Sequence, residues 1–189
     1  MKKEAIIIAG PNGSGKTTFA NNFIEEYPFT YINADNIIKE AYSPQITNLR
    51  SETLKIIFNK IETTVNSGAN FIIETTLSGR YFIRLIESLI SNNYEITIIY
   101  IFLENPKLCV ERIKERVLKG GHYISDVEVE RRFYRSKNNF WKLYRQYCDK
   151  WFVFYNSTQQ FTELAIGKKD NYIVSNRNLF NIFLKDIKQ

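Results

Sequence analysis

Cysteine and histidine are scarce in this sequence, so a structural zinc site lacks the ligands it would need. The 189 residues include two cysteines, Cys109 and Cys148, and a single histidine, His122. Structural zinc sites use about four cysteine or histidine ligands at close spacing. The two cysteines lie far apart in the sequence and no secretion signal precedes them, so we expect two reduced, partly buried thiols.

Long apolar runs are also lacking. No run approaches the roughly 20 residues that a membrane-spanning helix needs. The apolar segment 5–9 is too short for a signal peptide and leads directly into a glycine-rich run. We therefore expect a cytoplasmic protein with no membrane partner. The absence of repeats, low-complexity tracts and linkers predicts one domain, residues 1–189.

The glycine-rich run covers residues 10–17 and reads GPNGSGKT. It matches G-x-x-x-x-G-K-[ST], the phosphate-binding P-loop. Glycines let successive N–H groups turn toward phosphates, and the N-terminus of the following helix adds partial positive charge. Lys16 would reach the β- and γ-phosphates of ATP, and Thr17 would take Mg²⁺. The predicted ATP-binding residues are Gly10, Pro11, Asn12, Gly13, Ser14, Gly15, Lys16, Thr17 and Thr18.

Apolar segments and helical patterns alternate along the chain. We expect strands at 4–9, 29–33, 70–73, 96–102 and 151–155. Among the helices, we expect a short one at 37–41, one over about 127–147 and one over 179–187. Strands that alternate with helices form a parallel sheet covered on both faces. The expected fold class is α/β: a P-loop NTPase or kinase three-layer α/β/α sandwich with a five-stranded parallel core. A small hairpin and a short helix are expected to follow, at about 160–189.

Ligands of such sheets lie beyond the carboxyl ends of the strands. The second predicted strand ends near Asp35, and the third ends at Glu74, Thr75 and Thr76. Asp35 is a candidate base for an acceptor hydroxyl, although an aspartate there also suits a helix N-cap. Glu74 is a candidate to hold Mg²⁺ through water or to bind the acceptor with Thr75 and Thr76. The alternative is a solvated strand end.

The positive charge is concentrated in residues 107–145, here called the lid segment. It holds 11 Lys and Arg against 5 Asp and Glu, whereas the rest of the chain holds 15 of each. Such a segment suits a polyphosphate or a nucleic acid, or forms a solvated helical face. We expect its arginines to close over a triphosphate about a hinge at Gly120-Gly121. His122 in the same loop is more typical of a hydrogen-bonded loop residue than of a catalyst.

These motifs together resemble the zeta toxin family of P-loop kinases, and most closely its compact chromosomal members. The resemblance rests on residues 9–18, Asn33-Ala34-Asp35, residues 74–79, Arg116-Val117 with Gly120-Gly121-His122, and residues 131–136. It implies an ATP- and Mg²⁺-dependent kinase that phosphorylates UDP-N-acetylglucosamine, and an antitoxin partner that blocks the nucleotide site. Lys16 would be the phosphate lysine, Asp35 the acceptor base and Glu74 the substrate-binding acid. Arg116 and either Arg132 or Arg135 would be the catalytic lid arginines.

Two other functions remain open at this point. A nucleotide or the 5′-hydroxyl of a nucleic acid would be the acceptor if the lid segment formed a strand-binding groove. A non-catalytic, ATP-dependent switch would keep the P-loop and its partner response without phosphoryl transfer. The sequence also departs from the resembled pattern after the fifth strand, where Tyr155-Asn156-Ser157 stands in place of Asp-Asn-Ser.

Overall fold

The structure, a computed structural model, describes residues 3–26, 29–33, 49–158 and 160–187, and for residues 26 and 49–54 it describes only the main chain. Its elements, in chain order, are β1 (Lys3–Ala9), α1 (Lys16–Glu26), β2 (Thr30–Asn33), α3 (Leu49–Asn66), β3 (Phe71–Thr75), α4 (Phe82–Ser91), β4 (Tyr94–Phe102), α5 (Pro106–Leu118), α6 (Asp126–Lys142), the 3₁₀ turn Tyr144–Gln146, β5 (Lys150–Tyr155), β6 (Thr162–Lys168), β7 (Asn171–Val174) and α7 (Arg177–Leu184).

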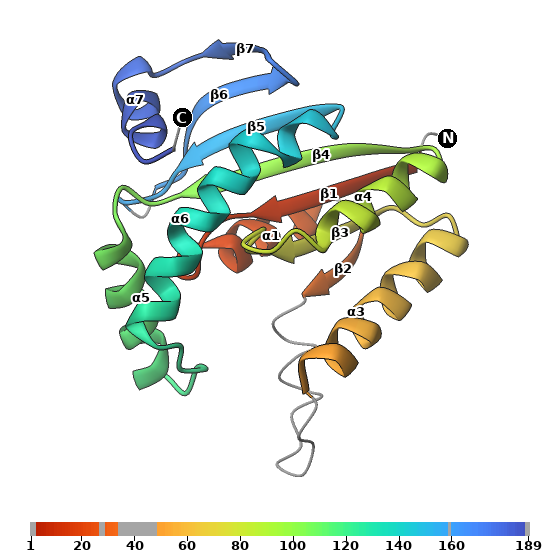
Figure 1. The fold of residues 1–189 in the computed structure, drawn as a ribbon, viewed down its shortest axis with the longest axis horizontal. Coiled ribbons are helices and arrows are strands. Elements are labelled where there is room, and N and C mark those ends of the chain that lie inside the picture. The colour runs from red at the N-terminus through yellow and green to blue at the C-terminus, as the bar shows by residue number, and fades with distance from the viewer. Residues whose placement is uncertain (1–2, 27–28, 34–48, 159, 188–189) are drawn as a thin grey trace.

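These strands form one seven-stranded sheet in the order β2-β3-β1-β4-β5-β6-β7 (Figure 1). The first five strands pair in parallel. The hairpin of β6 and β7 adds two antiparallel strands to the edge beyond β5. The predicted five-stranded parallel core and C-terminal hairpin are therefore confirmed, and the hairpin continues the same sheet.

Strand β1 is the middle one of the five parallel strands, and side chains on both of its faces are buried. Ile7 contributes to a large core with α3, α4, α6 and α7, whereas Ile6 and Ile8 pack with α1 on the opposite face. Fully burying one isoleucine side chain stabilises a fold by about 1.5–3 kcal/mol. The described helices therefore form two layers around the sheet, with α1 behind it in Figure 1, as the three-layer prediction requires.

The strand order decides which residues meet at the carboxyl edge. Strand β1 pairs with β3 so that Ala9 lies opposite Thr75, and with β4 so that Ala9 lies opposite Tyr100. The P-loop begins immediately after Ala9. Glu74 is consequently a direct neighbour of the P-loop, as expected from a third strand beside the first.

Helices α6 and α7 have bounds that differ from the predicted ones. Helix α6 ends at Lys142 rather than near residue 147, because Leu143 leaves helical geometry with φ −121° and ψ −64°. Helix α7 begins at Arg177, two residues earlier than expected, and the Asn176 side chain caps it by accepting a hydrogen bond from the main-chain N–H of Leu179 at 3.1 Å. The short helix expected at 37–41 lies outside the described residues.

Both cysteine thiols are free and buried, more completely than expected. Burial raises the pKa of Cys109 and of Cys148 to about 12.

Across the part of the chain that the structure describes, helices are too short or too polar to span a bilayer.

Candidate active site

The P-loop has a backbone that only glycine can follow at two of its positions. Gly10 has φ +144° and Gly15 has φ +92°. A Cβ on Gly10 would lie 2.1 Å from the carbonyl oxygen of Ile101, and one on Gly15 would lie 2.4 Å from Nδ2 of Asn156. The loop is thus packed directly against the ends of β4 and β5.

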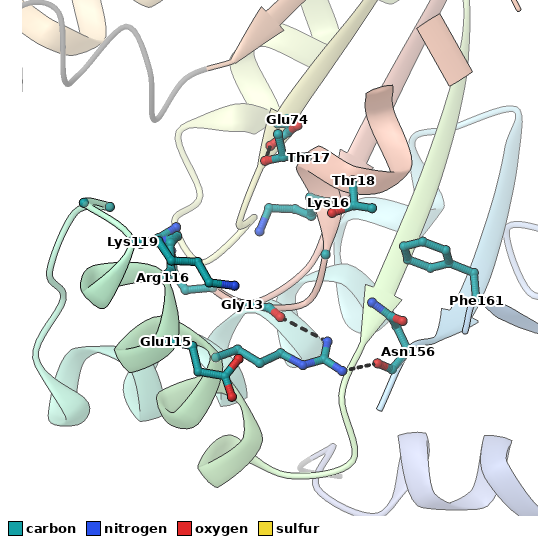
Figure 2. A pocket seen from close by; sticks show the side chains of 15 residues that line it. Gly13, Lys16, Thr17, Thr18, Glu74, Glu115, Arg116, Lys119, Asn156 and Phe161 are labelled. Atoms are coloured by element: carbon teal, nitrogen blue, oxygen red, sulfur yellow. Dashed lines mark hydrogen bonds between the residues drawn. The ribbon is translucent and has the colours of Figure 1, made fainter. Parts of the chain in front are cut away.

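Above this loop lies a pocket of about 750 Å³, shown in Figure 2. It is bounded by the P-loop, the end of β3, helix α5 with the turn that follows it, and the segment after β5. Its size is in the range of pockets that hold a nucleotide-sized ligand. The lining residues are Asn12, Gly13, Gly15, Lys16, Thr17, Thr18, Glu74, Arg112, Glu115, Arg116, Lys119, Gly120, Gly121, Asn156 and Phe161.

Lys16 begins α1 and is held close to the loop. The residue is 7% exposed, and Nζ donates a hydrogen bond to the main-chain carbonyl of Pro11 at 2.9 Å. The ammonium therefore sits over the curled backbone, where the loop N–H groups and the start of α1 also favour an anion. The predicted phosphate lysine and the predicted phosphate loop face the same pocket.

Glu74 is buried at the end of β3, with 4% of its surface exposed. Its Oε2 accepts hydrogen bonds from the Thr17 hydroxyl at 3.0 Å and from Asn33 Nδ2 at 3.3 Å, and its Oε1 accepts one from the Tyr31 hydroxyl. Burial, and then the Glu74 carboxylate, raise the pKa of Tyr31 well above its ordinary value. Tyr31 therefore remains a hydrogen-bond donor at neutral pH.

The side chains at this point suit Mg²⁺. Thr17 and Glu74 supply hard oxygen atoms 3.0 Å apart, and they lie together in Figure 2. Mg²⁺ sites of nucleotide-binding proteins typically use one or two protein oxygens, with phosphates and water completing the octahedron. Within the described residues there is no cluster of three or more His, Cys, Asp or Glu that could form an all-protein metal cage. The residues present fit a metal that arrives with a nucleotide.

Arg112 on α5 binds main-chain carbonyls, a role that its place in the sequence does not predict. Its guanidinium donates to the carbonyl oxygens of Gly13 at 3.4 Å, Asn156 at 2.7 Å and Ser157 at 3.2 Å. It thereby ties α5 to the P-loop and to the end of β5, and two of these bonds are drawn as dashed lines in Figure 2. The i, i+4 spacing of Arg112 and Arg116 predicts a shared helix face, but it does not reveal that one of the two arginines binds the main chain.

Asn156 and Phe161 were also missed as pocket residues. Asn156 Nδ2 donates to the carbonyl of Ser14 at 2.8 Å, whereas its Oδ1 is buried without a hydrogen bond. Asn12 Oδ1 and Ser14 Oγ are also buried without a hydrogen bond. Among the described residues, these three oxygens are the buried side-chain polar atoms that lack a hydrogen-bond partner. Leaving such atoms unpaired costs about 1–3 kcal/mol each, so their concentration here is typical of a functional site.

The predicted lid arginines lie in different surroundings. Arg116 lines the pocket, and one of its NH2 groups donates to the main-chain carbonyl of His122 at 2.9 Å. Arg132 pairs with Glu128 at 2.6 Å, together with Arg131 at 2.7 Å. Arg135 is exposed, and of the described lid arginines neither it nor Arg132 lines the pocket. Contact of Arg132 or Arg135 with a phosphate stays a prediction.

The other predicted site residues shape the loops. Gly10, Pro11 and Ser14 are buried beneath the pocket surface. Thr75 Oγ1 accepts a bond from the main-chain N–H of Leu77 at 3.2 Å, and Thr76 Oγ1 lies 2.9 Å from Ser78 Oγ, so both threonines shape the turn after β3. Asp35 lies outside the described residues.

The fold and the P-loop define a P-loop NTPase of the α/β/α class. The family model described as "AAA domain" matches residues 6–132, and the chain belongs to that family. The match spans β1 through the first part of α6, and therefore includes the P-loop, Glu74, Arg112 and Arg116.

Three known proteins illustrate the similarity. An uncharacterized protein of Haemophilus influenzae is 27% identical over 135 residues, which are 70% of this chain and 94% of that protein. A chain of the AvrRxo1-ORF1:AvrRxo1-ORF2 complex with ATP superposes with a TM-score of 0.71 at 12% identity. That match covers all of this chain, which spans 65% of the length of the other. The PezAT toxin-antitoxin structure of Streptococcus pneumoniae gives a TM-score of 0.66 at 16% identity, covering 100% of this chain and 80% of that one.

Proposed function

We propose that this protein is a kinase that transfers the γ-phosphoryl group of ATP, in the presence of Mg²⁺, to a hydroxyl of a small acceptor. One observation carries the proposal: the P-loop, the Thr17–Glu74 pair and the cationic face of α5 meet in one pocket. Phosphoryl transfer requires that the phosphate donor and the acceptor are positioned together. It also requires a metal ion and positive side chains that neutralise the charge on the phosphate oxygens. Arg112, Arg116 and Lys119 are the lid cations that line the pocket, beside Glu115.

The donor end of the pocket is the better defined one. The P-loop amides and Lys16 would bind the phosphates, and the Thr17 hydroxyl would contact the metal. Phe161 lines the side of the pocket near Thr18 and Asn156 in Figure 2. Its ring is fixed by an edge-to-face contact with Phe19, with centroids 5.0 Å apart. An aromatic face suits stacking of a nucleobase, which is worth about 1–3 kcal/mol, so we place the adenine against Phe161.

For the acceptor we propose a UDP-amino sugar, with UDP-N-acetylglucosamine as the first candidate. Asp35, which follows β2 in the sequence, would accept the hydroxyl proton, and Glu74 would orient the acceptor or a metal-bound water. The support is the resemblance in sequence to zeta toxins, together with the similarity in fold to the PezAT structure. The complex partners of PezAT and AvrRxo1 also support an antitoxin as a partner of this chain.

The structure gives less support to a nucleic-acid acceptor. Several cations of the lid segment are engaged within the protein: Arg112 with main-chain carbonyls, Arg131 and Arg132 with Glu128, and Lys137 with Asp186. Nucleic-acid binding depends on cations that are available to neutralise phosphates. We therefore favour a small molecule.

The decisive experiment incubates the protein with ATP, Mg²⁺ and a panel of acceptors, and mass spectrometry then detects the gain of one phosphoryl group. UDP-N-acetylglucosamine comes first on the panel, with other sugar nucleotides, nucleotides and 5′-hydroxyl oligonucleotides beside it. Asp35→Asn should lose turnover and keep ATP affinity, whereas Lys16→Ala should weaken both. If ATP binds but no acceptor is phosphorylated, the kinase assignment is wrong and a nucleotide-dependent switch takes its place.

A further inference from the structure

The Glu74 carboxylate accepts hydrogen bonds from side chains of two elements, and the first of these elements is β2. Strand β2 pairs with β3 so that Asn33 lies opposite Glu74. Tyr31 and Asn33 are two residues apart, so they project from the same face of the strand. The Tyr31 hydroxyl donates to Glu74 Oε1, while Asn33 Nδ2 donates to the tyrosine oxygen at 3.0 Å and to Glu74 Oε2 at 3.3 Å. These bonds fix the orientation of the carboxylate.

The second element is α1, which contributes Thr17, the predicted metal ligand. Its hydroxyl donates to Glu74 Oε2 at 3.0 Å. A threonine hydroxyl has one proton to donate and two lone pairs to offer. Because the proton is directed at Glu74, the lone pairs of Thr17 Oγ1 are directed elsewhere. The position of the carboxylate therefore decides where Thr17 can ligate a cation.

We propose that Tyr31 is a positioning residue that acts through Glu74 to orient the Thr17 hydroxyl toward the Mg²⁺ that accompanies the nucleotide. The chain of contacts runs from β2 across the end of β3 to the first turn of α1. Hydrogen-bonded partners behind metal ligands typically change metal affinity by about 10- to 100-fold when they are removed. The inference rests on the nucleotide-binding part of the proposed function and is independent of the acceptor.

The test measures metal affinity directly. Mn²⁺ replaces Mg²⁺, and electron paramagnetic resonance follows the free ion as it is titrated into protein with a non-hydrolysable ATP analogue. Tyr31→Phe keeps the ring and removes the hydroxyl, and should weaken Mn²⁺ binding by roughly tenfold. Binding of the analogue in EDTA should stay unchanged, a separation that a general loss of structure would not produce.

Tyr94→Phe is the matched control. It also deletes one tyrosine hydroxyl hydrogen bond, to the carbonyl of Ala69 at 2.9 Å, but at the opposite end of the sheet. Its Mn²⁺ affinity should equal that of the wild type. Equal affinities of Tyr31→Phe and Tyr94→Phe would overturn the inference. Asn33→Ala, which removes a donor to the same pair, provides a second variant and should also weaken Mn²⁺ binding.

A double-mutant cycle tests whether Tyr31 works through Glu74. In a Glu74→Ala background, which removes the acceptor of the Tyr31 hydroxyl, Tyr31→Phe should have no further effect on Mn²⁺ affinity. Additive losses would show that the tyrosine acts by another route and would contradict the inference. A wild-type protein that binds no Mn²⁺ with the ATP analogue would overturn the proposed function as well, so the two failures are distinguishable.

Discussion

The guanidinium of Arg112 and the main chain of Asn156 are joined by a 2.7 Å hydrogen bond, and the side chain of Asn156 in turn donates to the carbonyl of Ser14 at 2.8 Å. Residues far apart in the sequence thus form one continuous link from the lid segment, through the end of β5, to the P-loop. The loop is therefore held in place by two side chains that lie outside the P-loop motif itself.

Removal of this link should weaken nucleotide binding. Arg112→Met keeps the aliphatic length but leaves three buried or partly buried carbonyls without their donor, which should cost about 1–3 kcal/mol of folding stability and reduce ATP affinity. Lys114→Met is the control on the same helix. Its ion pair with Asp126 is exposed on both sides, and such pairs contribute at most about 1 kcal/mol. Urea unfolding and calorimetric titration with ATP measure both effects, and equal ATP affinities in the two variants would contradict the expectation.

Gly15→Ala should abolish ATP binding. The added methyl would meet Nδ2 of Asn156 at 2.4 Å and would also strain a backbone with φ +92°. Gly68→Ala separates the two causes, because Gly68 has φ +70° but its Cβ would lie 3.6 Å from the nearest atom, Cε of Lys3. Gly68→Ala should lose only the stability that a left-handed backbone costs an alanine, about 1 kcal/mol. It should bind ATP normally. Calorimetric titration distinguishes the variants, and normal ATP binding by Gly15→Ala would refute the clash.

A buried lysine joins α6 to the segment that follows α7. Lys137 is 1% exposed, its Nζ lies 2.9 Å from the Asp186 carboxylate, and it contacts the faces of Phe102, Phe133 and Phe183. Burial lowers the pKa of Lys137, and the Asp186 carboxylate opposes that shift. Asp186→Asn removes the opposing charge and should destabilise the fold by about 3 kcal/mol.

Lys137→Met should be less harmful than Asp186→Asn, because it removes the buried charge and leaves an apolar chain among the three rings. The order of the two midpoints in urea unfolding is the observable. The reverse order would show that the ion pair itself, and not the cost of an unpaired ammonium, dominates at this position.

The buried thiols predict a specific pH dependence. Burial raises the pKa of Cys109 and Cys148 from 9.0 in the unfolded chain to about 12. Their stabilising contribution is therefore fully present below pH 9 and is lost as the pH rises toward 12. The Cys109→Ala, Cys148→Ala double variant should show a shallower decline of unfolding free energy between pH 9 and 11. At pH 8 both thiols should resist a disulfide reagent until guanidinium unfolds the protein, and rapid reaction of the native protein would contradict their burial.

The features that could be predicted correctly from the sequence are those that depend on a short run of consecutive residues. The parallel core follows from apolar segments such as Ala5–Ala9, and the P-loop follows from glycine spacing. The contributions of Arg112, Asn156 and Phe161 depend on which strands are neighbours and on side-chain hydrogen bonds to the main chain, and neither leaves a local pattern. The structure adds for Arg132 an ion pair with Glu128, four residues earlier, and contact of Arg132 with a phosphate stays a prediction.

The pocket combines residues 12–18, Glu74, the 112–121 stretch of α5 and its turn, Asn156 and Phe161. A nascent chain that has left the ribosome only as far as α5 already contains the P-loop, but β5 and the residues after it are still missing. A ligand that contacts all of these segments stabilises a chain that extends through Phe161 more than a shorter one, by an amount that grows with the logarithm of the ligand concentration. A nucleotide in this pocket would therefore protect chains that reach Phe161 from proteolysis, and shorter chains with an intact P-loop would gain less protection.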